Sequence, residues 1–123
     1  MKIRIRGNSI RIRVSRSEVE LLAAEGRLEE KTELPNGTFS YILQSSNEYD
    51  HLNAGYEHGA ITMYIPHNIA TQWAGNDTVG YEYNLPLTNG GVLYLLLEKD
   101  FKCIDAAVKE DQSDNYENPL KSC

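Results

Sequence analysis

The stretch that most constrains the fold is residues 2–14, KIRIRGNSIRIRV, in which aliphatic residues alternate with lysine or arginine on both sides of Gly7-Asn8-Ser9. A period of two is typical of a β-strand with one buried face, because successive side chains point to opposite faces. Glycine and asparagine tolerate a positive φ, so the central tripeptide predicts a reversal of the chain. We therefore expect a β-hairpin with one aliphatic face and one basic face.

The register of this hairpin can be predicted from the aliphatic side chains, which should lie beside one another. That condition sets two aliphatic pairs and two arginine pairs opposite each other: Ile5 with Ile12, Ile3 with Val14, Arg6 with Arg11, and Arg4 with Arg13. Like charges directly opposite each other destabilise a sheet, so the arginine face needs negative charge from a ligand or from elsewhere in the chain.

Composition fits one domain, since 123 residues with 41% hydrophobic residues can bury a core without disulfides. The net charge of -6 argues against non-specific nucleic-acid binding by the whole surface. The charge is unevenly distributed, however, because six of the 12 basic residues lie within residues 1–16 and no acidic residue precedes Glu18. We expect a basic edge on an acidic body.

Together with the hairpin, the patterns that follow it predict the order strand-strand-helix-strand-strand twice. Ser15 and Glu18 have the spacing of a capping box, Gly26 can end that helix, and Pro66 suits the start of a second helix. The remaining strands are predicted at residues 28–34, 38–44, 54–57, 60–65, 79–85 and 92–98, the last of these central because it is the most apolar.

The resulting fold class is mainly β with two short helices, an eight-stranded, antiparallel, barrel-like assembly of two pseudo-repeated units. We expect one domain over residues 1–104, with pseudo-repeats at 1–44 and 54–98. Residues 105–123 are expected to form an acidic tail, with Tyr116 and Leu120 as possible anchors and a short helix over 104–109 as an alternative.

Residues 7–14, GNSIRIRV, followed by a short helix and a glycine, resemble the start of the swapped-hairpin domains of the AbrB and MazE type. Residues 65–69, IPHNI, resemble the other common form of the same element. The resemblance implies a single chain that carries both interlocking copies, and a DNA-binding role for basic residues of the first strands.

The whole chain is also similar to an uncharacterised bacterial family. The similarity rests on the start MKIRIRGNSIR, on Ile65-Pro66 ahead of Trp73, and on EKDFKC at residues 98–103. It implies one intact domain and no assigned activity.

The arginine face is the main candidate site, because a guanidinium presents a planar donor fork suited to phosphate or carboxylate. The predicted anion-binding residues are Arg4, Arg6, Arg11 and Arg13, with Arg16 as an outer contact. The competing interpretation is internal pairing with Glu98, Asp100 and the acidic residues of the tail.

No complete catalytic or cofactor motif is present, so a non-enzymatic binding module is favoured and no cofactor or metal is predicted. An AbrB-like DNA-binding regulator is the first alternative. The second is a metal-dependent phosphate or polyphosphate enzyme using Glu82, Glu98 and Asp100. His51, His58 and His67 follow no metal-binding spacing and are interpreted as polar loop residues.

The two lone cysteines, Cys103 and Cys123, suggest a reducing compartment, and the charged N-terminus has no apolar signal core. We expect a cytoplasmic monomer or homodimer that does not contact membranes. The expected partner is an anionic ligand or an acidic protein, with nucleic acid possible but not favoured.

Overall fold

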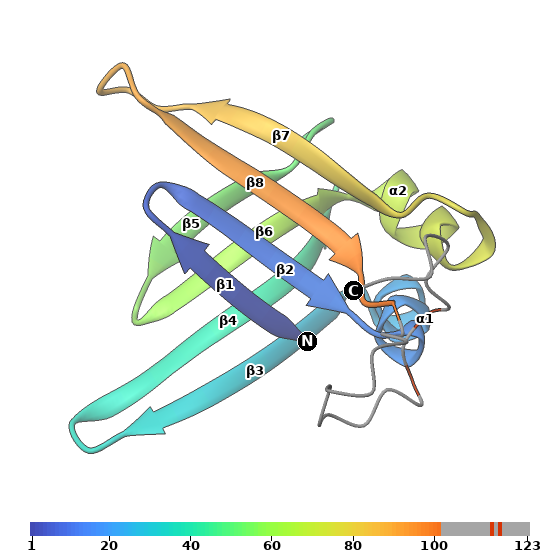
Figure 1. The fold of residues 1–123 in the computed structure, drawn as a ribbon, viewed down its shortest axis with the longest axis horizontal. Helices are drawn as coiled ribbons and strands as arrows, with labels where there is room; N and C mark the ends of the chain where they lie inside the picture. The colour runs from blue at the N-terminus through green and yellow to red at the C-terminus, as the bar shows by residue number, and fades with distance from the viewer. Residues whose placement is uncertain (102–113, 115, 117–123) are drawn as a thin grey trace.

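The structure is a computed structural model that describes residues 1–101, 114 and 116 (Figure 1). It contains eight strands, two α-helices and one 3-10 helix. In chain order these are β1 (Lys2–Arg6), β2 (Ser9–Val14), α1 (Arg16–Glu25), β3 (Arg27–Leu34), β4 (Gly37–Ser46), β5 (Asn53–Glu57), β6 (Ala60–Pro66), α2 (His67–Gln72), η1 (Trp73–Gly75), β7 (Gly80–Pro86) and β8 (Val92–Lys99). The predicted order of two strand-strand-helix-strand-strand units is confirmed.

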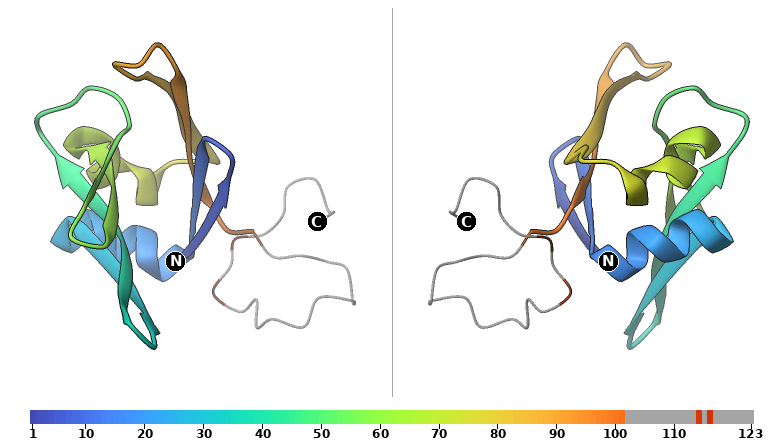
Figure 2. Two further views of the ribbon diagram at one scale, coloured as in Figure 1. Left: turned by 90° about the vertical axis from the view of Figure 1, so that its left-hand side faces the viewer. Right: turned by 90° about the vertical axis from the view of Figure 1, so that its right-hand side faces the viewer.

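The strands form two four-stranded sheets, ordered β1-β2-β8-β7 and β3-β4-β6-β5. Each sheet combines the first hairpin of one unit with the second hairpin of the other, so the two units exchange hairpins. The two sheets face each other, and both helices lie at the same end of them (Figures 1 and 2). This exchange is the single-chain, interlocked arrangement that the resemblance to swapped-hairpin domains implies.

The prediction of a wholly antiparallel assembly is wrong, because β2 pairs with β8 in parallel and β4 pairs with β6 in parallel. Both parallel pairs lie where the two units meet. A pseudo-twofold exchange brings a strand that enters a helix beside the last strand of the other unit, and these run in the same direction. Within the described residues the eight strands form two separate sheets and not one closed barrel.

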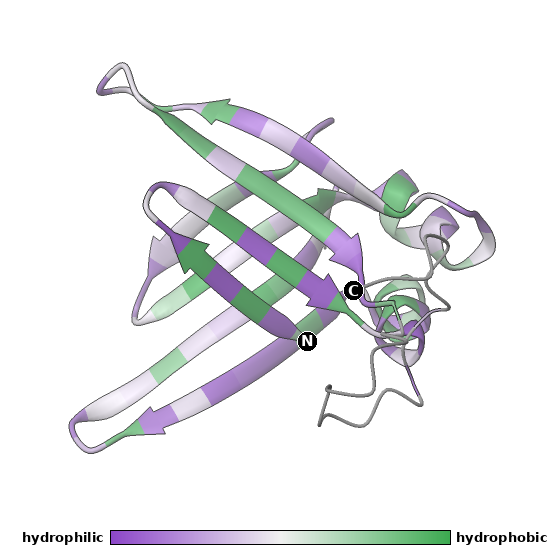
Figure 3. Ribbon diagram, viewed as in Figure 1, coloured by the Kyte–Doolittle hydropathy of each residue, from purple (hydrophilic) through white to green (hydrophobic). Residues whose placement is uncertain are grey.

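The first hairpin forms as predicted, but its register is shifted by two residues from the prediction. The observed pairs are Lys2 with Arg13, Ile3 with Ile12, Arg4 with Arg11, Ile5 with Ile10 and Arg6 with Ser9. Gly7 adopts a φ of 52°, so the chain reverses in two residues and Ser9 joins the strand. A shift of two keeps every side chain on its predicted face, and Figure 3 shows the alternation of hydrophobic and hydrophilic residues along β1 and β2.

The capping box predicted for the first helix is present in full. The Ser15 side chain accepts from the Glu18 backbone N–H, and the Glu18 side chain accepts from the Ser15 backbone N–H. Gly26 ends α1 in the left-handed conformation, with φ 76°, and its N–H donates to the Leu22 carbonyl. Val19 and Leu22 are the buried residues of this helix.

The core fills the space between the sheets and under the helices. Trp73 is fully buried and its indole donates to the Thr78 carbonyl at 2.7 Å. Its ring lies edge-on to Tyr81, with centroids 5.4 Å apart. Trp73 is therefore a core residue. The apolar strand β8 is central, as predicted, and buries Leu95 and Leu97 completely.

Several predictions lie outside the described residues: the helix over 104–109, both cysteines, Leu120 and most of the tail. Tyr116 is described and bridges to Phe101, and its N–H donates to the Asp100 carbonyl at 2.7 Å. Among the helices that the structure describes, none has the length and apolarity needed to span a membrane.

Asp114 completes the cap of α1. Its carboxylate accepts from the Ser17 hydroxyl at 2.5 Å and from the Ser17 N–H at 3.2 Å, and its carbonyl accepts from the Arg16 N–H at 3.0 Å. Because the Ser15 hydroxyl accepts from the Glu18 N–H and the Glu18 carboxylate accepts from the Ser15 N–H, the four free donors of the first turn all have partners. The hydrogen bond from Ser17 lowers the pKa of Asp114 below its usual value of 3.8.

We expect Asp114→Ala to lower the free energy of unfolding by about 0.5 kcal/mol, the low end for loss of a helix cap, because this carboxylate is exposed. A carboxylate whose pKa is lower in the folded than in the unfolded state stabilises the protein at pH values above its unfolded-state pKa. That stabilisation is lost as the pH falls through its folded-state pKa. In urea denaturation below pH 4, the gap between the natural protein and Asp114→Asn should therefore close. A gap independent of pH would contradict the role of the charge.

Candidate functional site

The candidate site lies on the outer face of the sheet β1-β2-β8-β7. Because Arg4 faces Arg11 and Lys2 faces Arg13, the basic side chains of the two strands share one side of the sheet. We call the surface formed by Lys2, Arg4, Arg6, Arg11 and Arg13 the basic face. The parallel neighbour β8 adds three residues to the same side, Tyr94, Leu96 and Glu98, which are in register with Ser9, Arg11 and Arg13.

Two of the five side chains of the basic face, Arg11 and Arg13, pair with one carboxylate of the same sheet. One oxygen of Glu98, Oε1, accepts from Arg11 Nε at 2.5 Å and from Arg13 Nε at 2.7 Å. The Glu98 side chain is 16% exposed and the two arginines are 30% and 42% exposed, so water screens this network only in part. For these two arginines the structure shows pairing with an acidic residue of the same chain, which is the competing interpretation.

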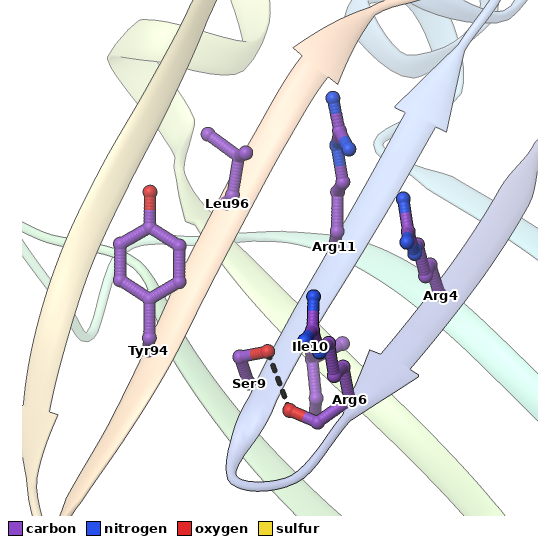
Figure 4. A pocket seen from close by; sticks show the side chains of 7 residues that line it. All are labelled: Arg4, Arg6, Ser9, Ile10, Arg11, Tyr94 and Leu96. Carbon is purple, nitrogen blue, oxygen red and sulfur yellow. Dashed lines mark hydrogen bonds between the residues drawn. The ribbon is translucent and has the colours of Figure 1, made fainter.

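Arg4 and Arg6 differ from these two. Among the described residues, no side chain forms an ion pair or a hydrogen bond with either guanidinium. Both line a pocket of about 230 Å³ together with Arg11. Figure 4 shows the three side chains extending from the same side of neighbouring strands. Three guanidiniums therefore meet at one pocket, and among the residues that the structure describes only Arg11 is paired to a carboxylate.

The far side of this pocket is formed by Tyr94 and Leu96 of β8, with Ser9 and Ile10 at its base. The Tyr94 hydroxyl donates to Glu82 Oε2 at 2.5 Å, and this hydrogen bond raises the pKa of the phenol. At neutral pH the hydroxyl is protonated and directs its proton to Glu82, so its oxygen can still accept. The wall consequently offers an apolar surface and an ordered phenol beside the guanidiniums.

Sequence reasoning missed Tyr94 and Leu96 as part of the site. Their signal is the same period of two in residues 92–98, which places residues 94, 96 and 98 on one face. No short-range pattern in the sequence indicates that this strand lies beside residues 9–14.

A second, smaller pocket of about 180 Å³ lies on the other side of the facing pair Arg4 and Arg11, and Lys2 and Arg13 line it. Lys2 Nζ pairs with the Asp100 carboxylate at 2.9 Å. Within the described part of the chain, the basic side chains of this face that lack a carboxylate partner are therefore the two nearest the turn of the hairpin, Arg4 and Arg6.

Arg16 lies apart from this group. It begins α1, and its guanidinium carbon is 5.4 Å from the centre of the Tyr116 ring. It lines a different pocket, together with Lys99 and Asp77. Lys99 is buried, which lowers its pKa, and its Nζ donates to the Asn76 carbonyl at 2.8 Å. The structure thus does not bring Arg16 to the other four arginines.

The acidic residues considered for a metal site each have another partner. Glu98 pairs with Arg11 and Arg13, Glu82 accepts from Tyr94, and Asp100 pairs with Lys2. Across the part of the chain that the structure describes, no three residues of the metal-binding types are grouped to hold an ion.

The histidines lie apart from one another. His51 stacks on Tyr83 with ring centroids 4.0 Å apart. His58 is exposed beside Glu57, and His67 Nδ1 lies 3.1 Å from the Ser45 hydroxyl.

Fold and site together define a mainly β protein of two hairpin-exchanged units with a basic outer face on one sheet. The chain belongs to a family of unknown function (DUF7009), whose model matches residues 1–120. The similarity of the whole chain to an uncharacterised family is thereby confirmed. No curated protein and no solved structure matches the chain.

Proposed function

We propose that this protein is a non-enzymatic binding module that takes an anionic ligand on the basic face, at Arg4, Arg6 and Arg11. The observation that carries the proposal is the contrast within that face. Arg11 and Arg13 share the Glu98 carboxylate, whereas Arg4 and Arg6 have no acidic partner among the described residues and border a pocket.

Repulsion between the arginines of the basic face also favours a bound anion. Arg4 lies directly opposite Arg11, and such a pair costs stability unless an anion lies nearby. Glu98 offers one carboxylate to two arginines, so it does not compensate the charge at the turn end of the hairpin. A phosphate or carboxylate group in the pocket would accept from both guanidiniums in the bidentate geometry that arginine favours.

The double variant Arg4→Gln/Arg6→Gln is expected to weaken binding of inorganic tripolyphosphate about tenfold, because a hydrogen bond to a charged group contributes roughly 1.5–3 kcal/mol before screening. Isothermal titration calorimetry at low and physiological ionic strength measures this change. Arg27→Gln/Lys31→Gln is the matched control, since it removes the same two positive charges from the other sheet. Equal losses in both variants would contradict the proposal.

A second candidate is an AbrB-like DNA-binding regulator. The exchange of hairpins between the two units favours it, because the resemblance of residues 7–14 implies that arrangement. Against it, the strands equivalent to β1 and β2 in the second unit, β5 and β6, carry no arginine or lysine. A logarithm of the affinity for duplex DNA that falls steeply and linearly with the logarithm of salt concentration would favour this candidate.

We propose that the protein is located in the cytoplasm.

A further inference from the structure

The strand β1 is the edge of its sheet. Among the strands of the described residues it pairs with β2 alone, and every residue of β1 except Ile3 is exposed. The free side of an edge strand presents a row of backbone donors and acceptors to which another extended chain can pair. This edge adjoins the pocket of Arg4 and Arg6, so backbone hydrogen-bonding groups and positive charge lie next to each other.

The hairpin geometry identifies which backbone groups face the free side. In a hairpin closed by a two-residue turn, the pair that flanks the turn is hydrogen-bonded, and every second pair after it is hydrogen-bonded too. Here these are the pairs made by Arg6, Arg4 and Lys2. The N–H and C=O groups of Ile3 and Ile5 are therefore directed to the free edge. No described backbone group outside the sheet bonds to them.

The side chains of β1 divide into two rows. Lys2, Arg4 and Arg6 form a row on the outer face, spaced two residues or roughly 6.6 Å apart. Ile5 lies on the inner face and is 52% exposed, which is unusual for an isoleucine beside the core. A chain lying along this edge would meet cations on one face and an uncovered aliphatic side chain on the other.

We propose that β1 is a docking site for an extended acidic segment of a partner protein, which adds as a fifth strand with carboxylates at alternate positions and apolar side chains between them. This inference rests on the proposed function, since the carboxylates take the anion site at Arg4 and Arg6. An added strand has the same period of two as β1, so its acidic residues face the cations and its apolar residues face Ile5. A nucleic-acid backbone would leave Ile5 and the free backbone groups unused.

The charges of β1 also make the edge selective. Two copies of β1 brought together would place lysine and arginine opposite lysine and arginine, so the edge disfavours pairing with itself. An acidic strand removes the same repulsion.

The test compares two synthetic peptides of equal composition. In one, glutamate alternates with valine, and in the other the glutamates and valines form two blocks. We expect the alternating peptide to bind at least tenfold more tightly than the block peptide by titration calorimetry. Ile5→Pro should abolish peptide binding while leaving tripolyphosphate binding unchanged, because it removes a donor that faces only the free edge. Ile5→Val keeps that donor and an aliphatic side chain and is the matched control.

If Ile5→Pro does not fold, as judged by circular dichroism, N-methylation of alternate amides of the peptide tests the same hydrogen bonds from the other side. Equal binding of the two peptides, with tripolyphosphate binding that still depends on Arg4 and Arg6, would overturn the docking proposal and leave the anion site intact. Absence of binding by peptides and tripolyphosphate alike would overturn both. Duplex DNA that displaces the alternating peptide and binds Ile5→Pro unchanged would overturn docking in favour of nucleic acid.

Discussion

Replacement of Trp73 by alanine is expected to lower the free energy of unfolding by about 3–5 kcal/mol, the range for truncation of a buried aromatic side chain. Trp73 is fully buried where η1 begins, between α2 and β7. Its ring packs against Tyr81, and the Lys99 ammonium lies 5.7 Å from the ring centre. Truncation leaves a cavity and also removes the donor to the Thr78 carbonyl. Urea denaturation followed by circular dichroism measures the loss.

Two further substitutions test whether the loss of stability is specific to the buried indole of Trp73. Trp73→Phe keeps most of the apolar volume but removes the indole donor, so we expect a loss roughly half as large. Tyr56→Ala removes an aromatic side chain that is 69% exposed, and the change should stay within about 0.5 kcal/mol. If Trp73→Ala changed stability as little as Tyr56→Ala does, the placement of Trp73 in the core would be wrong.

Features with a local cause could be predicted from the sequence. The alternation in residues 2–14 defines a strand pair with one basic face, and Ser15, Glu18 and Gly26 define the ends of α1, because each signal acts over a few residues. The register was wrong although the faces were right. Aliphatic residues pair with one another in both registers, so only the length of the turn at Gly7 distinguishes them.

Features with a non-local cause could not be predicted in the same way. The parallel pairing of β2 with β8 joins residues more than eighty positions apart, and no short-range pattern specifies it. This pairing alone places Glu98 beside Arg13 and Tyr94 beside Ser9. The sequence could predict that the arginines need negative charge, but which of them receive it depends on the neighbour that the exchange of hairpins supplies.

Glu98 allows a test of how internal pairing limits ligand binding, because its single carboxylate pairs with two arginines of the basic face. We expect Glu98→Gln to tighten binding of tripolyphosphate about 30-fold, equivalent to roughly 2 kcal/mol, the scale of a hydrogen bond to a charged group. The substitution removes a negative charge from the basic face and releases Arg11 and Arg13 to the ligand. Titration calorimetry measures the gain, which should shrink at high ionic strength because part of it is electrostatic.

Glu33→Gln is the control for net charge, since it neutralises an exposed carboxylate on β3, in the other sheet, and should change affinity less than twofold. Stability should also respond, because two partly exposed arginines lose their partner, and we expect Glu98→Gln to lower the free energy of unfolding by about 1 kcal/mol. Tripolyphosphate at saturation should restore more than this loss by binding only the folded state. A variant that is less stable but binds no more tightly would mean that Glu98 and its two arginines form a purely structural network, and that the ligand, if one binds, contacts Arg4 and Arg6 alone.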